Sequence, residues 1–181
     1  MLTLKLMRYL IYALASAALL MASGGLSGRR APGFSLPDLH VQQQDLQDYR
    51  GKIVLLDIIQ TRCPHCAAFS EVLERAHKKY GGKVAVLSIV VPPDTQATVT
   101  QFVAAHGIST PVLFDCGQVS VSYLKVSPAN PKVDVPHVFL IDGRGMIRND
   151  FGYALETKNI FEGDGLNAEI DRLLAETASG K

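Results

Sequence analysis

The tetrapeptide Cys63-Pro-His-Cys66 constrains this chain most, because it lies between an apolar run and a helical pattern. Residues 53–59 are apolar except for one acid and rich in β-branched residues, which predicts a strand buried on both faces. Apolar residues then recur at helical spacing over residues 64–80, and two glycines follow. A cysteine pair between a buried strand and a helix start predicts an α/β domain with its chemistry at that helix end.

The rest of the chain continues the alternation of strands and helices. Further strands are expected over 84–91 and 111–114, with a hairpin of 138–141 and 146–151 across Asp142-Gly-Arg-Gly145. Further helices are expected from Asp94 or Thr95 to His106, over 119–124, and over 166–178. Residues 31–39 read as an extended segment and 127–135 as a loop. We find no repeat and no second domain, so residues 26–181 are predicted to form one mixed sheet flanked by helices.

The first 25 residues have the pattern of a targeting segment. Lys5 and Arg8 precede an apolar run over residues 9–22, and small residues follow as far as Gly25. This order is typical of a signal peptide, and the run is shorter than the roughly 20 residues that span a bilayer. The alternative is an uncleaved membrane anchor through residues 9–22, because leucines before Lys5 and beside it could lengthen the run. Either way we expect the domain to work outside the cytoplasm, in the periplasm or secreted.

Composition excludes other classes of protein. The formal net charge is +1, and no basic run is present, so a nucleic-acid partner is not expected. Three cysteines are too few for a disulfide-stapled secreted domain. A four-thiolate zinc site would need a second cysteine pair, and only Cys116 remains, so no metal is expected.

The position of the cysteine pair predicts redox chemistry. A cysteine at a helix N-terminus meets unpaired N–H groups and the positive end of the helix dipole, which favour the thiolate that attacks disulfides. Pro64 is expected at the first helical position, where its missing N–H has no cost. His65, when protonated, and Arg62 would add positive charge on either side of Cys63.

Residues 31–151 resemble the TlpA-like branch of the thioredoxin superfamily. The resemblance rests on five segments: Ala31-Pro-x-Phe-x-Leu-x-Asp-Leu39, Tyr49-Arg-Gly-Lys-Ile-Val-Leu-Leu56, Thr61-x-Cys-Pro-x-Cys66, Pro111-Val-Leu-Phe-Asp115 and Val135-Pro-His-Val-Phe-Leu-Ile-Asp-Gly143. It implies a thioredoxin-like fold with an N-terminal extension and a protein-disulfide oxidoreductase. By that similarity Cys63 attacks and Cys66 resolves, and their redox-active disulfide serves without another cofactor.

The resemblance also assigns residues around the pair. Pro136 matches the family's cis-proline, which packs against the cysteines and helps bind the extended substrate. We expect its neighbours Val135 and His137 to contact substrate as well, with a packing role as the alternative for His137, which stands where the family commonly has a hydroxyl residue. Asp57, six residues before Cys63, matches a buried acid that exchanges protons with the resolving thiol. The sequence departs from the family in lacking tryptophan, in a long segment over 127–134, and in an additional cysteine. We expect that cysteine, Cys116, to be a small buried hydrophobe, with a third redox thiol as the alternative.

The implied partners are protein thiols or disulfides and a redox partner protein, and the chain is expected to be a monomer. The direction of electron flow stays open. TlpA-like proteins often act as reductants, whereas a proline-histidine pair between the cysteines occurs in strong oxidants and predicts a less reducing potential than that of thioredoxin. Two other functions remain open. One is a peroxiredoxin-like thiol peroxidase, and the other is a Cu(I)-binding chaperone that uses Cys63, Cys66 and either His65 or His137.

Overall fold

The computed structural model describes residues 25–179, whose central feature is a five-stranded mixed sheet. Its strand order is β5-β4-β3-β6-β7. The strands are β3 (Ile53–Ile59), β4 (Val84–Val90), β5 (Val112–Phe114), β6 (His137–Ile141) and β7 (Ile147–Gly152). The pairs β3–β4 and β4–β5 are parallel, whereas β3–β6 and β6–β7 are antiparallel. The predicted mixed sheet is therefore confirmed.

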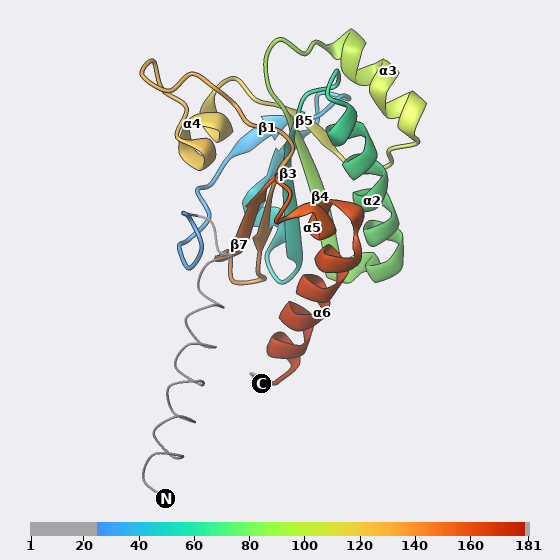
Figure 1. The fold of residues 1–181 in the computed structure, drawn as a ribbon, viewed down its shortest axis with the longest axis vertical. Coiled ribbons are helices and arrows are strands. Elements are labelled where there is room, and N and C mark those ends of the chain that lie inside the picture. Colours follow the sequence, from blue (N-terminus) through green and yellow to red (C-terminus); the bar gives the residue numbers. More distant parts are fainter. Residues whose placement is uncertain (1–24, 180–181) are drawn as a thin grey trace, which may run out of the picture.

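Helices cover both faces of this sheet (Figure 1). One face packs against α2 (Pro64–Tyr80), α5 (Lys158–Glu162) and α6 (Asp164–Ser179). The other face packs against α4 (Gln118–Leu124), the 3-10 helix η1 (Leu46–Tyr49) and the segment that precedes it. The remaining long helix, α3 (Gln96–His106), packs against residues of β3, β4 and β5. These residues lie near the end of β3 that leads into the cysteine pair. A short 3-10 turn, η2 (Gly81–Lys83), joins α2 to β4.

Strand β3 lies at the centre of the sheet and is buried along its whole length. Its neighbours are β4 on one side and β6 on the other, so residues 54–58 are paired on both sides, and the whole strand is covered on both faces. This explains why its sequence is a continuous apolar run rather than an alternating one. Because successive side chains point to opposite faces, Leu55, Asp57 and Ile59 share the face covered by α2, whereas Leu56 and Ile58 share the other.

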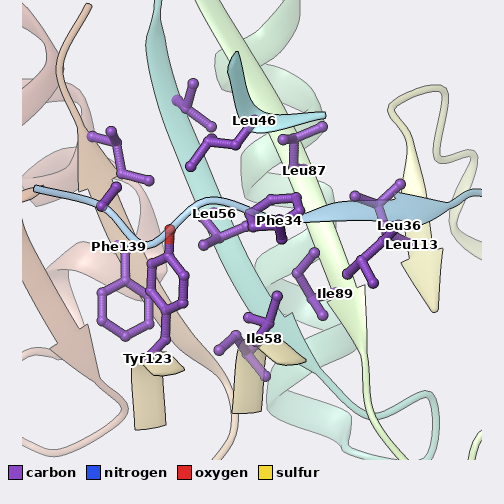
Figure 2. Close-up of a cluster of buried hydrophobic side chains, with 14 of the residues drawn as sticks. Phe34, Leu36, Leu46, Leu56, Ile58, Leu87, Ile89, Leu113, Tyr123 and Phe139 are labelled. Atoms are coloured by element: carbon purple, nitrogen blue, oxygen red, sulfur yellow. The ribbon is translucent and has the colours of Figure 1, made fainter. Parts of the chain in front are cut away.

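The second face carries a core of aliphatic and aromatic side chains (Figure 2). Phe34 enters this core from the N-terminal segment, and Tyr123 enters it from α4. The Tyr123 ring meets Phe139 edge-on, with centroids 5.0 Å apart, and its hydroxyl donates to the carbonyl of Pro32 at 2.7 Å. Tyr123 thus buries an apolar body while its one polar atom finds a partner.

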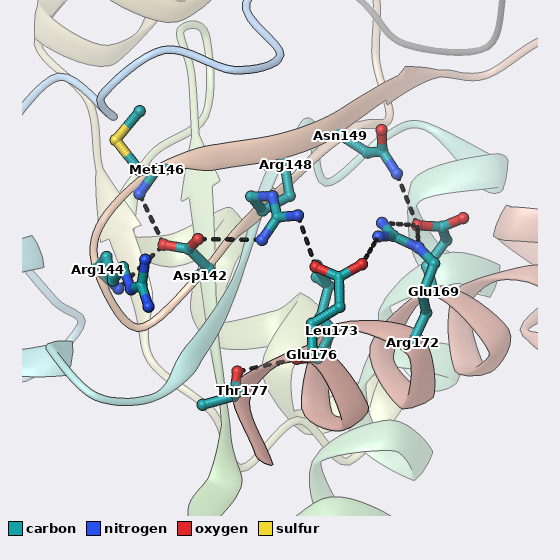
Figure 3. A network of polar contacts seen from close by, with 10 residues as sticks. All are labelled: Asp142, Arg144, Met146, Arg148, Asn149, Glu169, Arg172, Leu173, Glu176 and Thr177. Atoms are coloured by element: carbon teal, nitrogen blue, oxygen red, sulfur yellow. Dashed lines mark hydrogen bonds and ion pairs between the residues drawn. The ribbon is translucent and has the colours of Figure 1, made fainter. Parts of the chain in front are cut away.

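At the end of the sheet remote from the cysteines, a polar network ties α6 to the β6–β7 hairpin (Figure 3). Asp142 accepts the backbone N–H groups of Arg144 at 2.9 Å and Met146 at 3.0 Å, which closes the predicted hairpin turn. Arg148 then joins Asp142 at 3.3 Å to Glu176 of α6 at 2.6 Å. Ion pairs this exposed add little stability, so we assign the network a role in fixing the orientation of the hairpin turn and α6.

Most elements agree with the sequence-based expectation, and the differences lie in short segments. The extended N-terminal segment contains β1 (Ser35–Pro37), which pairs with β2 (Gln43–Asp45) in a separate two-stranded sheet that was not predicted. The final helix begins earlier than expected, at Asp164, and the short α5 precedes it. The predicted signal peptide or anchor over residues 1–25 lies outside the described residues except for Gly25. Among residues 25–179, no helix is long and apolar enough to cross a membrane.

Candidate active site

Cys63 is the N-cap residue of α2, as the sequence predicted. Its backbone is extended, at φ −86° and ψ 116°, and its sulfur accepts a hydrogen bond from the backbone N–H of Cys66 at 3.2 Å. Pro64 occupies the first turn of the helix. The half-buried sulfur therefore lies at a helix N-terminus with one N–H directed at it, which is an arrangement that stabilises a thiolate.

Cys66 lies one turn into the helix and is fully buried. It packs in an apolar cluster with Ile59 of β3 and Val99 of α3. Burial raises the pKa of the Cys66 thiol, and its hydrogen bond with Cys63 raises it further. The two thiols thus differ in access: Cys63 is open to a partner, whereas Cys66 can react only with a sulfur that has already reached Cys63.

Asp57 lies beneath the pair in the middle of β3 and is 0% exposed. Its register partners are Ser88 of β4 and Val138 of β6, and it occupies the sheet face on which α2 packs. Neither carboxyl oxygen has a hydrogen-bond partner in the described part of the chain. Burial raises the pKa of Asp57 well above its ordinary value, so the site contains a carboxyl group suited to hold a proton.

The loop before β6 forms the other side of the site. The peptide bond between Val135 and Pro136 is cis, as the family resemblance implied. The carbonyl oxygen of Val135 lies 3.9 Å from the sulfur of Cys63, which donates toward it. The structure therefore brings Val135 and Pro136 to the cysteine pair from a segment some seventy residues away in the sequence.

The two basic side chains near Cys63, Arg62 and His65, have different surroundings. Arg62 is exposed and makes no side-chain hydrogen bond or ion pair in the described structure. His65 is also exposed, but its ring stacks on Tyr153, with centroids 4.2 Å apart and planes 23° from parallel. Tyr153 follows β7, and nothing in the sequence pattern singled it out.

His137 is not brought together with the thiols, although it follows Pro136 directly. Its register partner is Ile58, so it lies on the face of the sheet opposite α2. There its ring stacks on Phe139 at 4.6 Å, and Nε2 lies 3.5 Å from the buried carboxylate of Asp150. The carboxylate also accepts the backbone N–H of Leu26 at 3.1 Å. This geometry favours a packing role for the His137 ring and leaves its backbone beside the substrate loop.

The expectation that Cys116 is buried is wrong, because Cys116 is exposed. It follows β5 in a turn that its neighbour Asp115 organises. The Asp115 carboxylate is buried and accepts three backbone N–H groups, from Gly117, Val119 and Ser120, at 2.8–3.0 Å. The Asp115 side chain is turned toward the start of α4, and the next residue, Cys116, faces solvent.

Asp94 supports the turn that leads into Cys63 through contacts that no sequence pattern indicated. Asp94 follows β4, and its carboxylate accepts the backbone N–H of Thr61 at 2.8 Å and the Thr61 hydroxyl. It also accepts the hydroxyl of Thr98, at 3.0 Å. Beside it, the Gln60 side chain donates to the carbonyl of Pro92 at 3.2 Å. The sequence identified Asp94 only as a possible helix cap, because its partners lie on a different strand connection.

Replacing Asp94 with alanine should lower the free energy of unfolding by about 1–3 kcal/mol, because the Thr61 N–H loses its partner. Asp94→Asn keeps an acceptor oxygen and should cost less. Urea unfolding of the two variants against the wild-type chain measures both values. Equal losses of unfolding free energy in the two variants would contradict this role of Asp94. They would mean that its charge, rather than its acceptor oxygens, stabilises the turn.

The fold and this site define the class of thioredoxin-fold thiol–disulfide oxidoreductases. Residues 27–150 match the AhpC/TSA family, and the chain belongs to that family. It is similar to the thioredoxin-like protein YneN of Bacillus subtilis (strain 168), with 28% identity over 124 residues, covering 67% of this chain and 69% of YneN. It is also similar to the thiol-disulfide oxidoreductase ResA of Bacillus thuringiensis (strain Al Hakam), with 30% identity over 120 residues and 66% of each chain covered. The chain thus spans about two thirds of the length of these curated relatives.

Among solved structures, the thioredoxin domain of a thiol-disulfide oxidoreductase from Bacteroides vulgatus superposes with a TM-score of 0.64. The alignment covers 80% of this chain and 97% of that domain at 17% sequence identity, which establishes the shared fold.

Proposed function

We propose that this chain is an extracytoplasmic enzyme that exchanges disulfides with protein substrates through Cys63 and Cys66. The observation that carries the proposal is the asymmetry of the pair. The half-buried Cys63 sulfur accepts a helix N–H, while Cys66 is buried behind it. A structural disulfide or a plain binding module would have no need for one accessible and one enclosed thiol at a helix N-terminus.

The exchange is balanced in sulfur, electrons and protons. The Cys63 thiolate attacks one sulfur of a substrate disulfide, whose S–S bond breaks, and the other substrate sulfur leaves as a thiolate and takes a proton. Cys66, once deprotonated, attacks the Cys63 sulfur, and the bond between Cys63 and the substrate breaks. The second substrate sulfur leaves as a thiolate and takes up a proton equivalent to the one that Cys66 lost. The substrate gains two electrons and two protons, and the enzyme is left with a Cys63–Cys66 disulfide. The same steps in reverse oxidise a substrate dithiol.

Asp57 would receive the proton of Cys66 in the second step. Its carboxyl group is buried on the same sheet face as Cys66, and its raised pKa suits a group that must take up and return a proton in an apolar site. Val135 and Pro136 would position an extended substrate segment, because the Val135 carbonyl already lies at the attacking sulfur. The electron transfer itself needs no cofactor beyond the cysteine pair, and a second redox protein would restore the starting state of the enzyme.

The proposed location outside the cytoplasm rests on the first 25 residues, with their basic start, apolar run and small-residue end. A disulfide exchanged with protein substrates also persists better in such a compartment. Protease treatment of cells that express the tagged full chain, after the outer membrane is opened, tests this location. The tag should be digested, and protection of the tag would contradict the proposal.

The reduction potential of the Cys63–Cys66 pair tests the activity. We expect a reversible disulfide with a potential less negative than about −270 mV, the value for thioredoxin, because the helix N-terminus and His65 favour the thiolate and so the reduced form. Equilibration with glutathione and dithiothreitol buffers, followed by alkylation and mass spectrometry, measures it. The Cys116→Ser variant is the matched control, since its potential should equal that of the wild-type chain.

Each outcome discriminates among the functions. A potential at or below about −270 mV would make the chain a reductant and overturn the expected direction only. Failure to form a reversible disulfide, together with tight stoichiometric Cu(I) binding, would favour the copper chaperone. Rapid peroxide consumption that Cys63→Ser abolishes would favour the peroxidase.

A further inference from the structure

A series of aromatic ring contacts joins His65, one of the two residues between the cysteines, to the hydrophobic core. The His65 ring stacks on Tyr153 at 4.2 Å. The Tyr153 ring in turn meets Phe161 of α5 edge-on at 5.2 Å, and Phe161 packs on Phe69 of α2 at 4.6 Å. His65 and Phe69 lie one turn apart on α2, so this series of ring contacts begins and ends on the helix that carries the cysteines.

Tyr153 is held independently of its ring. Its backbone N–H donates to the carbonyl of Pro136 at 3.2 Å, which ties the residue to the loop on the other side of Cys63. Phe161 is buried, and Tyr153 itself is 40% exposed. Tyr153 is therefore held by its backbone on one side and contacts a buried ring on the other, and it presents an aromatic face to the solvent-exposed imidazole of His65.

The face of an aromatic ring attracts a cation, and stacking restricts the imidazole to one orientation. Both effects matter only if His65 acts on the sulfur of Cys63, because an imidazolium beside Cys63 stabilises the thiolate and therefore the reduced state. No other described aromatic ring contacts His65, and neither Arg62 nor Cys63 has an aromatic neighbour of this kind.

We propose that Tyr153 is a positioning residue that raises the reduction potential of the Cys63–Cys66 pair by stacking on His65. The inference rests on the proposed function, since it concerns the potential of the same pair. Tyr153 lies nearly ninety positions from the cysteines in the sequence. Arg62, the immediate neighbour of Cys63, has no such aromatic ring to hold it in place in the described structure.

The test is a set of potentials measured by glutathione equilibration. Tyr153→Leu removes the aromatic face and should make reduction of the pair about two- to fivefold less favourable, or roughly 10–20 mV more negative. Tyr153→Phe keeps the face and should retain the wild-type value. In a His65→Leu background, Tyr153→Leu should have no further effect. Leu155→Ala is the matched control, because Leu155 lies in the same loop, is 86% exposed and makes no ring contact.

A second readout needs no variant. The ring protons of His65 should be shifted upfield in the NMR spectrum of the wild-type protein, because they lie over the Tyr153 ring. Normal shifts would overturn the inference, as would an equal effect of Tyr153→Leu with and without His65. These failures differ from failure of the proposed function, in which no reversible Cys63–Cys66 disulfide would form in the wild-type chain.

Discussion

Replacing Cys63 with serine is expected to reduce disulfide exchange on the order of 10³-fold or more, because a serine hydroxyl cannot replace the attacking thiolate. Cys63 is the half-buried sulfur at the helix N-terminus, whereas Cys66 is enclosed. Reduction of a model protein disulfide, followed by the appearance of free thiols, measures the rate. The fold should be retained, since a serine oxygen at an N-cap position still accepts the Cys66 N–H.

Replacing the other cysteine, Cys66, with serine should trap the mixed disulfide with substrate instead of preventing its formation. Cys66→Ser leaves the attack intact but removes the group that resolves the mixed disulfide, so the enzyme should accumulate covalently bound to its substrate. Non-reducing electrophoresis and mass spectrometry detect the adduct, and Cys116→Ser serves as the control that excludes adducts at the exposed thiol. If Cys63→Ser formed the adduct and Cys66→Ser did not, the assigned order of the two cysteines would be reversed.

Asp57→Asn is expected to slow the resolving step at neutral pH by about 10²-fold or more, because the amide cannot accept a proton from Cys66. The substitution preserves shape in the tightly packed centre of β3, where Asp57 is fully buried. Rapid mixing with a mixed-disulfide substrate separates the steps, and the first attack by Cys63 should keep its wild-type rate. Equal slowing of both steps would instead indicate a distorted site.

The same residue predicts how stability depends on pH. Burial raises the pKa of Asp57 in the folded state, so between the ordinary aspartate value and the raised value the folded chain binds more protons than the unfolded chain. The stability of the folded state therefore falls as pH rises through this window, by about 1.4 kcal/mol for each unit by which the pKa is raised. Urea unfolding of wild type and Asp57→Asn at a series of pH values should show this decline in the wild type alone.

A decline of equal size in both proteins would assign the pH dependence to other groups. Cys66, whose pKa burial also raises, titrates in the alkaline range, so the two windows are separable. The difference between wild type and Asp57→Asn from acid to neutral pH isolates Asp57, because carboxyl groups such as Asp38 and Glu176, whose pKa values are lowered, contribute equally to both proteins.

The parts of the site that the sequence predicted correctly are those set by local pattern. The continuous apolar run of β3 required a central strand, the cysteine at its exit fell at an N-cap, and the single acid in the run had to be buried. Pro136 was predicted from resemblance, and its cis bond is present. Periodicity and capping chemistry act over a few residues, and one sequence carries enough information to detect them.

What the sequence could not predict depends on contacts between distant segments. Asp94 and Tyr153 reach the site from the ends of β4 and β7, and neither position has an unusual local pattern. His137 was placed correctly along the chain, but its ring lies on the face of the sheet away from the thiols, which follows from the register of β6 against β3. The prediction for Cys116 was wrong because the buried Asp115 determines the turn, and no local pattern indicated that the Asp115 side chain would point inward.

Cys116 is a free, exposed thiol outside the redox pair, so it serves as an internal reference when thiols are counted. A fully reduced molecule, once unfolded, carries three thiols for an alkylating reagent, and a molecule with the Cys63–Cys66 disulfide carries one. Mass spectra should therefore contain species with three adducts or one, with Cys116 labelled in both. An unlabelled species could arise only if Cys116 had itself been oxidised or joined to a second molecule, so the adduct-free peak reports side reactions separately from the redox state of the active pair.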